Sequence, residues 1–169
     1  MRSFYASGIL LALLLSSGCS MMGDARVAGR MKNKPAPDFE LVALDGGKVR
    51  LSSLRGRPVV VAFWAYGCPP CSAEAPHLSR LSEKYAGSGL IILGINAWNE
   101  PQPDVARYVK EQRLKHRVLL DGNETFLSYG FTHIPTVLFI RPDGTVADVH
   151  HGFDGPTHLE QGIKRLVGG

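Results

Sequence analysis

The chain has 169 residues, of which 44% are hydrophobic and 20% are charged, a balance typical of a folded globular protein rather than a disordered one. This length supplies a full hydrophobic core for one domain, so folding does not depend on disulfide bonds. The formal net charge is +4 with no long basic run, and the scattered Lys and Arg residues argue against a nucleic-acid partner.

The first segment, residues 1–18, is predicted to be a signal peptide. An early Arg precedes an apolar run from Ile9 to Leu15 that is too short to span a bilayer as a stable helix. The sequence Leu-Ser-Ser-Gly-Cys that ends this segment resembles the lipobox of bacterial lipoproteins, although Ser16 stands where that pattern usually has Leu. The resemblance implies that Cys19 is lipidated, which would fix the protein to a membrane surface without a spanning helix. Ordinary signal cleavage near Cys19 is the alternative.

Residues 19–34 are predicted to form a lipidated tether, because small and basic residues punctuated by prolines continue to about Pro37. No internal repeat and no second change of composition follows. One domain is therefore expected over residues 35–169.

The expected elements of this domain alternate between strands and helices. Continuous apolar runs predict buried strands, apolar residues at helical spacing predict helices, and glycine-rich or Pro-Asp-Gly clusters predict turns. The first half is predicted to contain a β-hairpin over 39–54 that turns at Asp45-Gly46-Gly47, a strand over 58–65, a helix through Leu78, Leu81 and Tyr85, a strand over 89–97, and a helix through Val105, Tyr108 and Val109. The second half is predicted to contain a short strand at 117–121, a short helix over 124–130, two strands within 135–152, and a closing helix over 156–167. This order implies an α/β fold with a central mixed β-sheet, helices on both faces and an N-terminal β-hairpin.

Cys68 and Cys71 lie directly after a predicted buried strand, where a helix is expected to begin. A structural disulfide between residues this close would stabilise little, because the loop-closure entropy it removes grows with loop length. A metal site needs a second pair or well-spaced histidines; His77 is nearest, and the others lack ligand-like spacing. Neither a metal nor a cofactor is therefore expected. A redox pair fits best, and the structural and metal interpretations remain as alternatives.

The position of the pair predicts different roles for its two sulfurs. At the start of a helix, unpaired N–H groups and the helix dipole favour an anion, so the pKa of the Cys68 thiol should fall and Cys68 should attack first. Cys71, one turn further on, should be more buried and act second. Pro69 and Pro70 suit the first helical turn, because a missing N–H matters least there. They also remove donors from the thiolate, so a modest fall in pKa is expected.

Two stretches carry a resemblance to a known family. Phe-Trp-Ala-Tyr-Gly-Cys-Pro-Pro-Cys-Ser-Ala-Glu-Ala-Pro (63–76), together with His-Ile-Pro-Thr-Val-Leu-Phe-Ile-Arg-Pro-Asp-Gly (133–144), resembles the thioredoxin superfamily. The chain is most similar to the exported, membrane-tethered thiol–disulfide oxidoreductases of the TlpA/ResA type, in the redoxin group, over nearly all of its length from about residue 35. The resemblance implies a thioredoxin-like fold, with Cys68 as nucleophile and Cys71 as resolving thiol. It also implies that Pro135 is a cis-proline facing the pair and that the backbone at Ile134 receives the substrate chain.

Further residues match the family's pattern around the cysteines. An acid at the place of Glu74 tunes or shuttles protons in the reductive branch, and a partly buried carboxyl with a raised pKa could exchange protons near neutrality. The alternative is an exposed acid in the first helical turn. Trp64 matches an aromatic of the family, or is a packed core residue. Gly67 stands where a second Trp is common, which leaves more room for a partner. The expected substrate-binding residues are Trp64, Gly67, Pro69, Pro70, Ile134 and Pro135.

Three histidines are left outside this pattern. His133 precedes the Ile-Pro pair and is expected either to line the site or to be an exposed loop residue. His150 and His151 are expected to be solvated surface residues, because no partner for them is evident in the sequence.

The expected function is thiol–disulfide exchange through a mixed disulfide. The resemblance implies reduction of cysteine-containing exported proteins such as apocytochrome c, with a membrane-embedded electron donor recharging the pair. The protein is expected to be a monomer, lipid-anchored to a membrane and facing the periplasm or the cell exterior.

Two other functions remain open. A peroxiredoxin-like peroxidase usually has Thr or Ser three residues before its peroxidatic cysteine and Pro seven before, where this chain has Ala65 and Val61. A metal-binding lipoprotein is the non-enzymatic alternative, although copper carriers of this fold use a wider cysteine spacing and a distant histidine.

Overall fold

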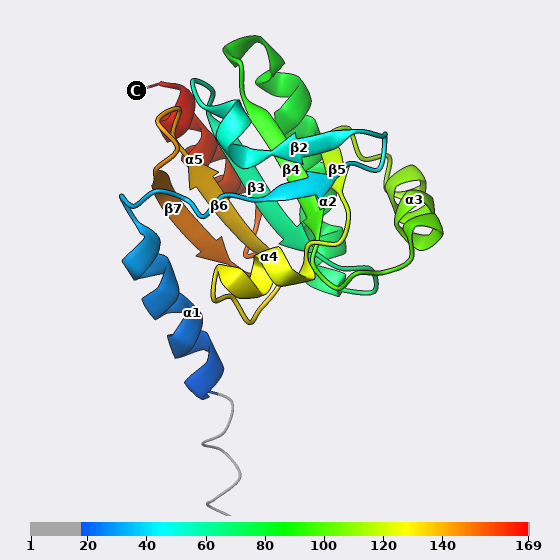
Figure 1. Ribbon diagram of the computed structural model, residues 1–169, viewed down its shortest axis with the longest axis horizontal. Coiled ribbons are helices and arrows are strands. Elements are labelled where there is room, and N and C mark those ends of the chain that lie inside the picture. The colour runs from blue at the N-terminus through cyan, green and yellow to red at the C-terminus, as the bar shows by residue number, and fades with distance from the viewer. Residues whose placement is uncertain (1–17, 169) are drawn as a thin grey trace, which may run out of the picture.

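A five-stranded β-sheet in the order β5-β4-β3-β6-β7 forms the centre of the structure, a computed structural model that describes residues 18–168 (Figure 1). The strands are β3 (Val59–Trp64), β4 (Ile91–Asn96), β5 (Arg117–Leu119), β6 (Thr136–Ile140) and β7 (Val146–His151). β3, β4 and β5 are parallel, whereas β6 runs antiparallel to β3 and β7 antiparallel to β6. The predicted mixed sheet is confirmed. The signal-peptide prediction falls almost entirely on residues 1–17, outside the described residues.

Helices cover both faces of this sheet, as predicted. The helices of the domain are α2 (Pro69–Lys84), α3 (Gln102–Glu111), α4 (Asn123–Ser128) and α5 (Pro156–Val167). Side chains alternate along a strand, so Val60 and Ala62 of β3 pack with α2 and α5, while Val61 and Phe63 pack with α4 on the other face. Val105 of α3 belongs to a third apolar cluster, which also contains the two cysteines.

The predicted β-hairpin forms between β1 (Glu40–Val42) and β2 (Lys48–Arg50), which pair antiparallel. Gly46 and Gly47 take positive φ values of 97° and 75° in its turn, a conformation that glycine adopts without steric cost. The end of the predicted hairpin differs, because Leu51–Leu54 form a 3₁₀ turn instead of continuing the strand. A bridge between Ala43 and Leu119 places the hairpin beside β5.

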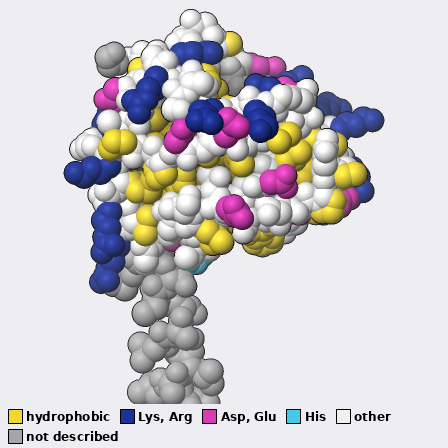
Figure 2. Space-filling view, in the orientation of Figure 1, with side chains coloured by type: hydrophobic (Ala, Val, Ile, Leu, Met, Phe, Trp, Pro, Cys, Tyr) yellow, Lys and Arg dark blue, Asp and Glu magenta, His cyan; other side chains and the backbone are white. Residues whose placement is uncertain are grey.

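Much of the predicted tether is a helix, α1 (Gly18–Met31), which lies beside β7 (Figure 1). Val27 and Met31, one turn apart, pack against the core, and Asp24 is buried with 2% of its surface exposed. Basic and acidic side chains are interspersed across the face shown in Figure 2. Within residues 18–168, no helix combines the length and hydrophobicity needed to cross a membrane.

Candidate active site

Cys68 and Cys71 are joined by a disulfide at the N-terminus of α2. Cys68 is the N-cap residue, and its Sγ accepts a hydrogen bond from the backbone N–H of Cys71 at 3.3 Å. Pro69 and Pro70 fill the first two helical positions, as predicted. Cys71 is 1% exposed and Cys68 7% exposed, so the expected order of burial is confirmed. The helix N-terminus therefore presents Cys68 where an anionic sulfur is stabilised.

The segment before β6 faces this disulfide across a surface groove. The peptide bond between Ile134 and Pro135 is cis, in agreement with the prediction from the resemblance. The groove is lined by Gly67, Cys68, Pro69, Trp98, Thr132, His133 and Ile134. Gly67 has φ +74°, and a side chain built on it would meet no atom within 4 Å, so this position leaves the groove open. A partner chain could approach the Cys68 sulfur along this groove.

Trp98 is a groove residue that the sequence analysis did not identify. Its side chain is 58% exposed, the most exposed of the large apolar residues in the groove. It follows β4 by two residues, and Glu100 holds its loop by accepting the Tyr66 N–H at 2.7 Å. The signal that could have found Trp98 is its place after a parallel strand, at the same sheet edge as the cysteines.

Glu74 lies in the second turn of α2 and is 1% exposed, which excludes the alternative of an exposed acid in the first turn. It lines a cavity of about 10 Å³, enough for roughly one water molecule, together with Trp64, Cys71 and His116. Burial raises the pKa of the carboxyl from 4.5 to about 8. Its Oε1 has no hydrogen-bond partner among residues 18–168. A buried carboxyl in the cavity that Cys71 also lines can therefore hold or release a proton near neutral pH.

Trp64 lies in the core below the cysteines rather than on the groove. It is 6% exposed, and its ring stacks on Tyr108 with centroids 4.7 Å apart. The Tyr108 hydroxyl donates a hydrogen bond to Ser72 Oγ at 3.2 Å. The core alternative describes Trp64 better than the predicted substrate contact, because its ring is covered by protein.

His116 is a second residue behind the cysteines that sequence reasoning missed. It is 7% exposed, and its Nδ1 lies 3.2 Å from Ser79 Oγ. Burial lowers the pKa of its imidazole to about 4, so the ring is neutral near pH 7. No motif marks His116, which reaches the cavity of Glu74 only through the packing of the chain before β5 on α2.

Asp24 of α1 contacts two residues that line the groove, Thr132 and His133. Its carboxylate accepts hydrogen bonds from the Thr132 N–H at 3.1 Å and the Thr132 hydroxyl at 2.9 Å, and Oδ2 lies 2.5 Å from His133 Nδ1. His133 thus lines the groove, one of the two expectations for it. Asp24 was missed because it lies in the predicted tether.

The prediction that His150 and His151 are solvated surface residues is wrong. Both are partly buried, because β7 extends to His151, lies beside α1 and contacts α5 through His150. His151 Nδ1 lies 2.9 Å from Thr136 Oγ1, and His150 stacks on His158 of α5 with ring centroids 3.4 Å apart.

Comparison with known proteins connects this geometry to an established chemistry. The model of the AhpC/TSA family matches residues 33–149. The thiol-disulfide oxidoreductase ResA of Bacillus thuringiensis subsp. konkukian is 34% identical over 135 residues, which cover 79% of this chain and 78% of that protein. ResA of Bacillus subtilis is 30% identical over 155 residues, covering 89% of this chain and 86% of that protein.

Solved structures share the same architecture. A crystal structure assigned as a thiol:disulfide interchange protein DsbE from Chlorobium tepidum matches with a TM-score of 0.75 and 29% identity. The match covers 80% of this chain and 97% of that one. The thioredoxin-like fold predicted from the resemblance is therefore confirmed.

Proposed function

Because the chain belongs to the AhpC/TSA family and is a thiol–disulfide oxidoreductase, we propose that it reduces disulfides in exported proteins. The observation that carries this proposal is the Cys68–Cys71 disulfide at the N-terminus of α2, beside the groove and in front of the buried Glu74. Its substrates are cysteine-containing proteins, and apocytochrome c is the proposed example.

The proposed exchange begins with the reduced pair. The Cys68 thiolate attacks one sulfur of the partner disulfide, and the other partner sulfur leaves as a thiolate. Cys71 then loses its proton and attacks Cys68 Sγ, which releases the second partner sulfur. Two electrons pass from the pair to the partner, and the Cys68–Cys71 disulfide described above is the product state.

Glu74 is proposed to take the proton of Cys71 in the second step. Both residues line the same small cavity, so one water molecule there could connect them. A carboxyl pKa of about 8 lets Glu74 exchange protons near neutral pH. The neutral imidazole of His116 at this cavity leaves Glu74 without a cationic partner on that side.

The groove is proposed to bind an extended segment of the partner. The backbone at Ile134 would align the segment, and the exposed ring of Trp98 would contact an apolar side chain next to the partner cysteine. The walls of the groove are proposed to include four residues that leave it open to the partner: Gly67, Pro69, Pro70 and Pro135. Trp64 is proposed to support the cysteines from the core.

The cellular setting is proposed from the N-terminal sequence. Cleavage before Cys19 and lipidation of that residue would hold the protein at a membrane. Residues 19–34 would connect the lipid to the catalytic domain, 35–169, and within them α1 packs on that domain. This arrangement gives a membrane-embedded electron donor access to the pair. The side chain of Cys19 is not described by the structure, so its lipidation stays a prediction.

The direction of electron flow is tested by the reduction potential of the pair. The full chain carrying Cys19→Ser retains only Cys68 and Cys71, since the sequence has three cysteines. It would be equilibrated with dithiothreitol or glutathione buffers and the fraction oxidised measured. A potential close to about −270 mV, the value of thioredoxin, supports a reductant. A potential near about −120 mV would assign disulfide donation instead and overturn the reductive proposal.

A peroxidase is the second candidate function, because the matched family is named for AhpC and TSA proteins. Ala65 and Val61 stand where such a site usually has a hydroxyl residue and a proline. Consumption of hydrogen peroxide with dithiothreitol as reductant separates the two functions. Turnover of peroxide that exceeds the reduction of a protein disulfide would favour the peroxidase.

A further inference from the structure

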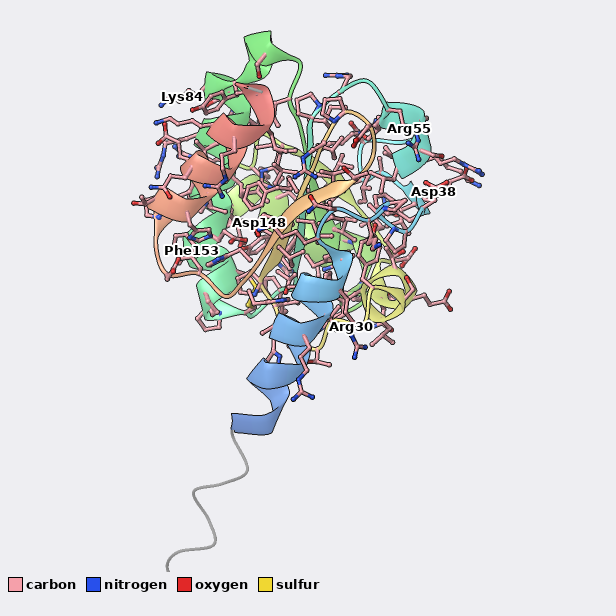
Figure 3. All side chains as sticks on the ribbon, turned by 90° about the vertical axis from the view of Figure 1, so that its left-hand side faces the viewer. Arg30, Asp38, Arg55, Lys84, Asp148 and Phe153 are labelled. Atoms are coloured by element: carbon pink, nitrogen blue, oxygen red, sulfur yellow. A yellow bond between two sulfur atoms is a disulfide. The ribbon has the colours of Figure 1, made fainter. Side chains whose placement is uncertain are left out.

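Three side chains outside the redox site come together where β7 leads into α5. His150 lies near the end of β7, Asp154 in the following loop, and His158 in the first turn of α5. Gly152 and Gly155 take φ values of 77° and 121°, which lets the chain reverse between strand and helix. The loop is marked by Phe153 in Figure 3. This reversal places one ligand atom of each of the three residues within 4.8 Å of the others.

Two of the three distances among these atoms, those of the contacts with Asp154, are near those in a metal site, and the two imidazole nitrogens lie within 4.8 Å of each other. Asp154 Oδ1 lies 3.4 Å from His150 Nε2 and 2.5 Å from His158 Nδ1. Two ligands of a tetrahedral zinc ion, at about 2.0–2.1 Å from the metal, are about 3.3 Å apart. The first distance already agrees. The second would widen by less than about 1 Å, which rotation of the Asp154 carboxylate could provide, because its side chain is 72% exposed.

The imidazole nitrogens also lack other partners. His158 Nε2 is buried and makes neither a hydrogen bond nor an ion-pair contact with any residue between 18 and 168, while His150 Nε2 and His158 Nδ1 meet only Asp154. The short contact between His158 and Asp154 has the distance of an ion pair but not the direction of a hydrogen bond. Buried polar atoms without partners are costly, and a bound cation would satisfy their lone pairs.

The two rings are also unsuited to carrying two protons. Their centroids are 3.4 Å apart, so two positive charges would repel strongly. Neutral imidazoles are the form that coordinates metals.

We propose that His150, Asp154 and His158 bind a divalent transition-metal ion of the zinc type. Two imidazole nitrogens and one carboxylate oxygen form a donor set that zinc accepts, whereas magnesium and calcium prefer oxygen ligands. Three protein ligands leave a fourth position on the solvent side of the exposed Asp154. The ion would tie the last strand to the last helix. This site uses neither cysteine and does not depend on the proposed direction of electron transfer.

The test is calorimetric titration of zinc chloride into the full chain carrying Cys19→Ser, with the Cys68–Cys71 disulfide intact so that no thiolate competes. One zinc ion should bind per chain. Asp154→Asn and His158→Ala should each weaken the affinity at least tenfold. His77→Ala is the matched control and should bind as the parent does, because His77 Nδ1 pairs with Arg80 and is not part of the cluster.

Two calorimetric results would overturn the proposal. One is the absence of stoichiometric zinc binding, and the other is an affinity that both variants leave unchanged. Asp154→Asn keeps the test valid even where His158→Ala fails to fold, because the Asp154 side chain is mostly solvent-exposed. Histidine ring ¹⁵N chemical shifts give an independent readout. Zinc should move the signals of His150 and His158, and movement of only other histidines would equally reject the site.

Discussion

Glu74 and Asp24 are two buried carboxyl groups, one in the cavity that Cys71 also lines and one in contact with Thr132 and His133 of the groove, and their surroundings differ. They are 1% and 2% exposed. Glu74 Oε1 has no hydrogen-bond partner among the described residues, whereas the Asp24 carboxylate is contacted by the Thr132 N–H, the Thr132 hydroxyl and His133 Nδ1. The two carboxyls are therefore equally buried but differ in role: Glu74 can bind a proton, whereas Asp24 fixes the segment that carries Thr132 and His133.

The difference follows from how each group replaces the water it has lost. A buried carboxyl group needs hydrogen-bond partners in place of water, and Asp24 has them in the Thr132 N–H, the Thr132 hydroxyl and the ring of His133. Without donors the protonated form is favoured, and burial raises the pKa of Glu74 to about 8. Glu74 lies beside Cys71, where a proton must move during exchange. Asp24 contacts Thr132 and His133, in the segment that leads to Pro135.

The largest expected effect, on the free energy of unfolding, comes from removing the Asp24 carboxyl. Asp24→Ala should lower the free energy of unfolding by about 3 kcal/mol, because it leaves the Thr132 N–H, the Thr132 hydroxyl and the His133 ring without their acceptor. Urea denaturation measures this loss. Amide hydrogen exchange should also show reduced protection of the Thr132 N–H.

Two controls define the meaning of that result. Glu124→Ala removes an exposed acid of α4 and should change stability by no more than about 0.5 kcal/mol. Asp24→Asn keeps an oxygen acceptor and should cost less than Asp24→Ala. An Asp24→Ala variant as stable as the parent would show that α1 does not anchor the groove.

The second expected effect, on the rate of disulfide reduction, tests whether Glu74 binds a proton during exchange. Glu74→Gln should slow reduction of a protein disulfide by about 100-fold near pH 7, which is within the range of lost general acid–base catalysis. The rate of the parent should change with pH around 8, where Glu74 titrates, and the variant should lose this change. Stopped-flow kinetics with a reduced chain and a disulfide-containing peptide measures both.

Asp24→Asn is the matched amide substitution for this experiment. It should retain the change of rate around pH 8, because Asp24 lies outside the cavity of Glu74. Loss of that change in both variants would mean that the titration belongs to another group.

The same two carboxyls show how far the sequence could predict this structure. The apolar run over 58–65 predicted a buried strand and therefore located Cys68 at the end of β3 and the start of α2. These features depend on neighbouring residues, which a sequence displays directly. Glu74 was selected through the family resemblance and a general argument about burial, and the structure supplies the burial itself.

Asp24 and His116 could not be predicted because their environments depend on distant segments. Asp24 meets Thr132 across 108 positions of the chain. The surrounding small and basic residues suggested a tether, and Val27 and Met31 alone gave too weak an apolar pattern to predict that α1 packs on the core. The pairing of His150 with His158 likewise required the reversal between β7 and α5.

The smallest expected effect is a pH dependence of stability that distinguishes the two carboxyls. The pKa of Glu74 is about 8 in the folded chain and 4.5 without burial, so the folded state binds more protons between these values. The free energy of unfolding must therefore fall as pH rises through this window. His116 acts in the opposite direction: its pKa is lowered from 6.5 to about 4, so it adds stability as pH rises from about 4 to 6.5.

Between pH 6.5 and 8 the lowered pKa values of His77, His116, His150 and His151 still add some stability as pH rises, so the loss caused by Glu74 is read as the difference between two chains: the oxidised parent should lose about 2 kcal/mol relative to Glu74→Gln across this interval. Urea denaturation at the two pH values measures the loss. Glu74→Gln should remove it, because an amide does not titrate, whereas Asp24→Asn should keep it. If Glu74→Gln retained the parent's loss, Glu74 would already be ionised in the folded chain. Burial without donors would then not suffice to hold a proton beside Cys71, and its proposed role in resolving the mixed disulfide would fail with it.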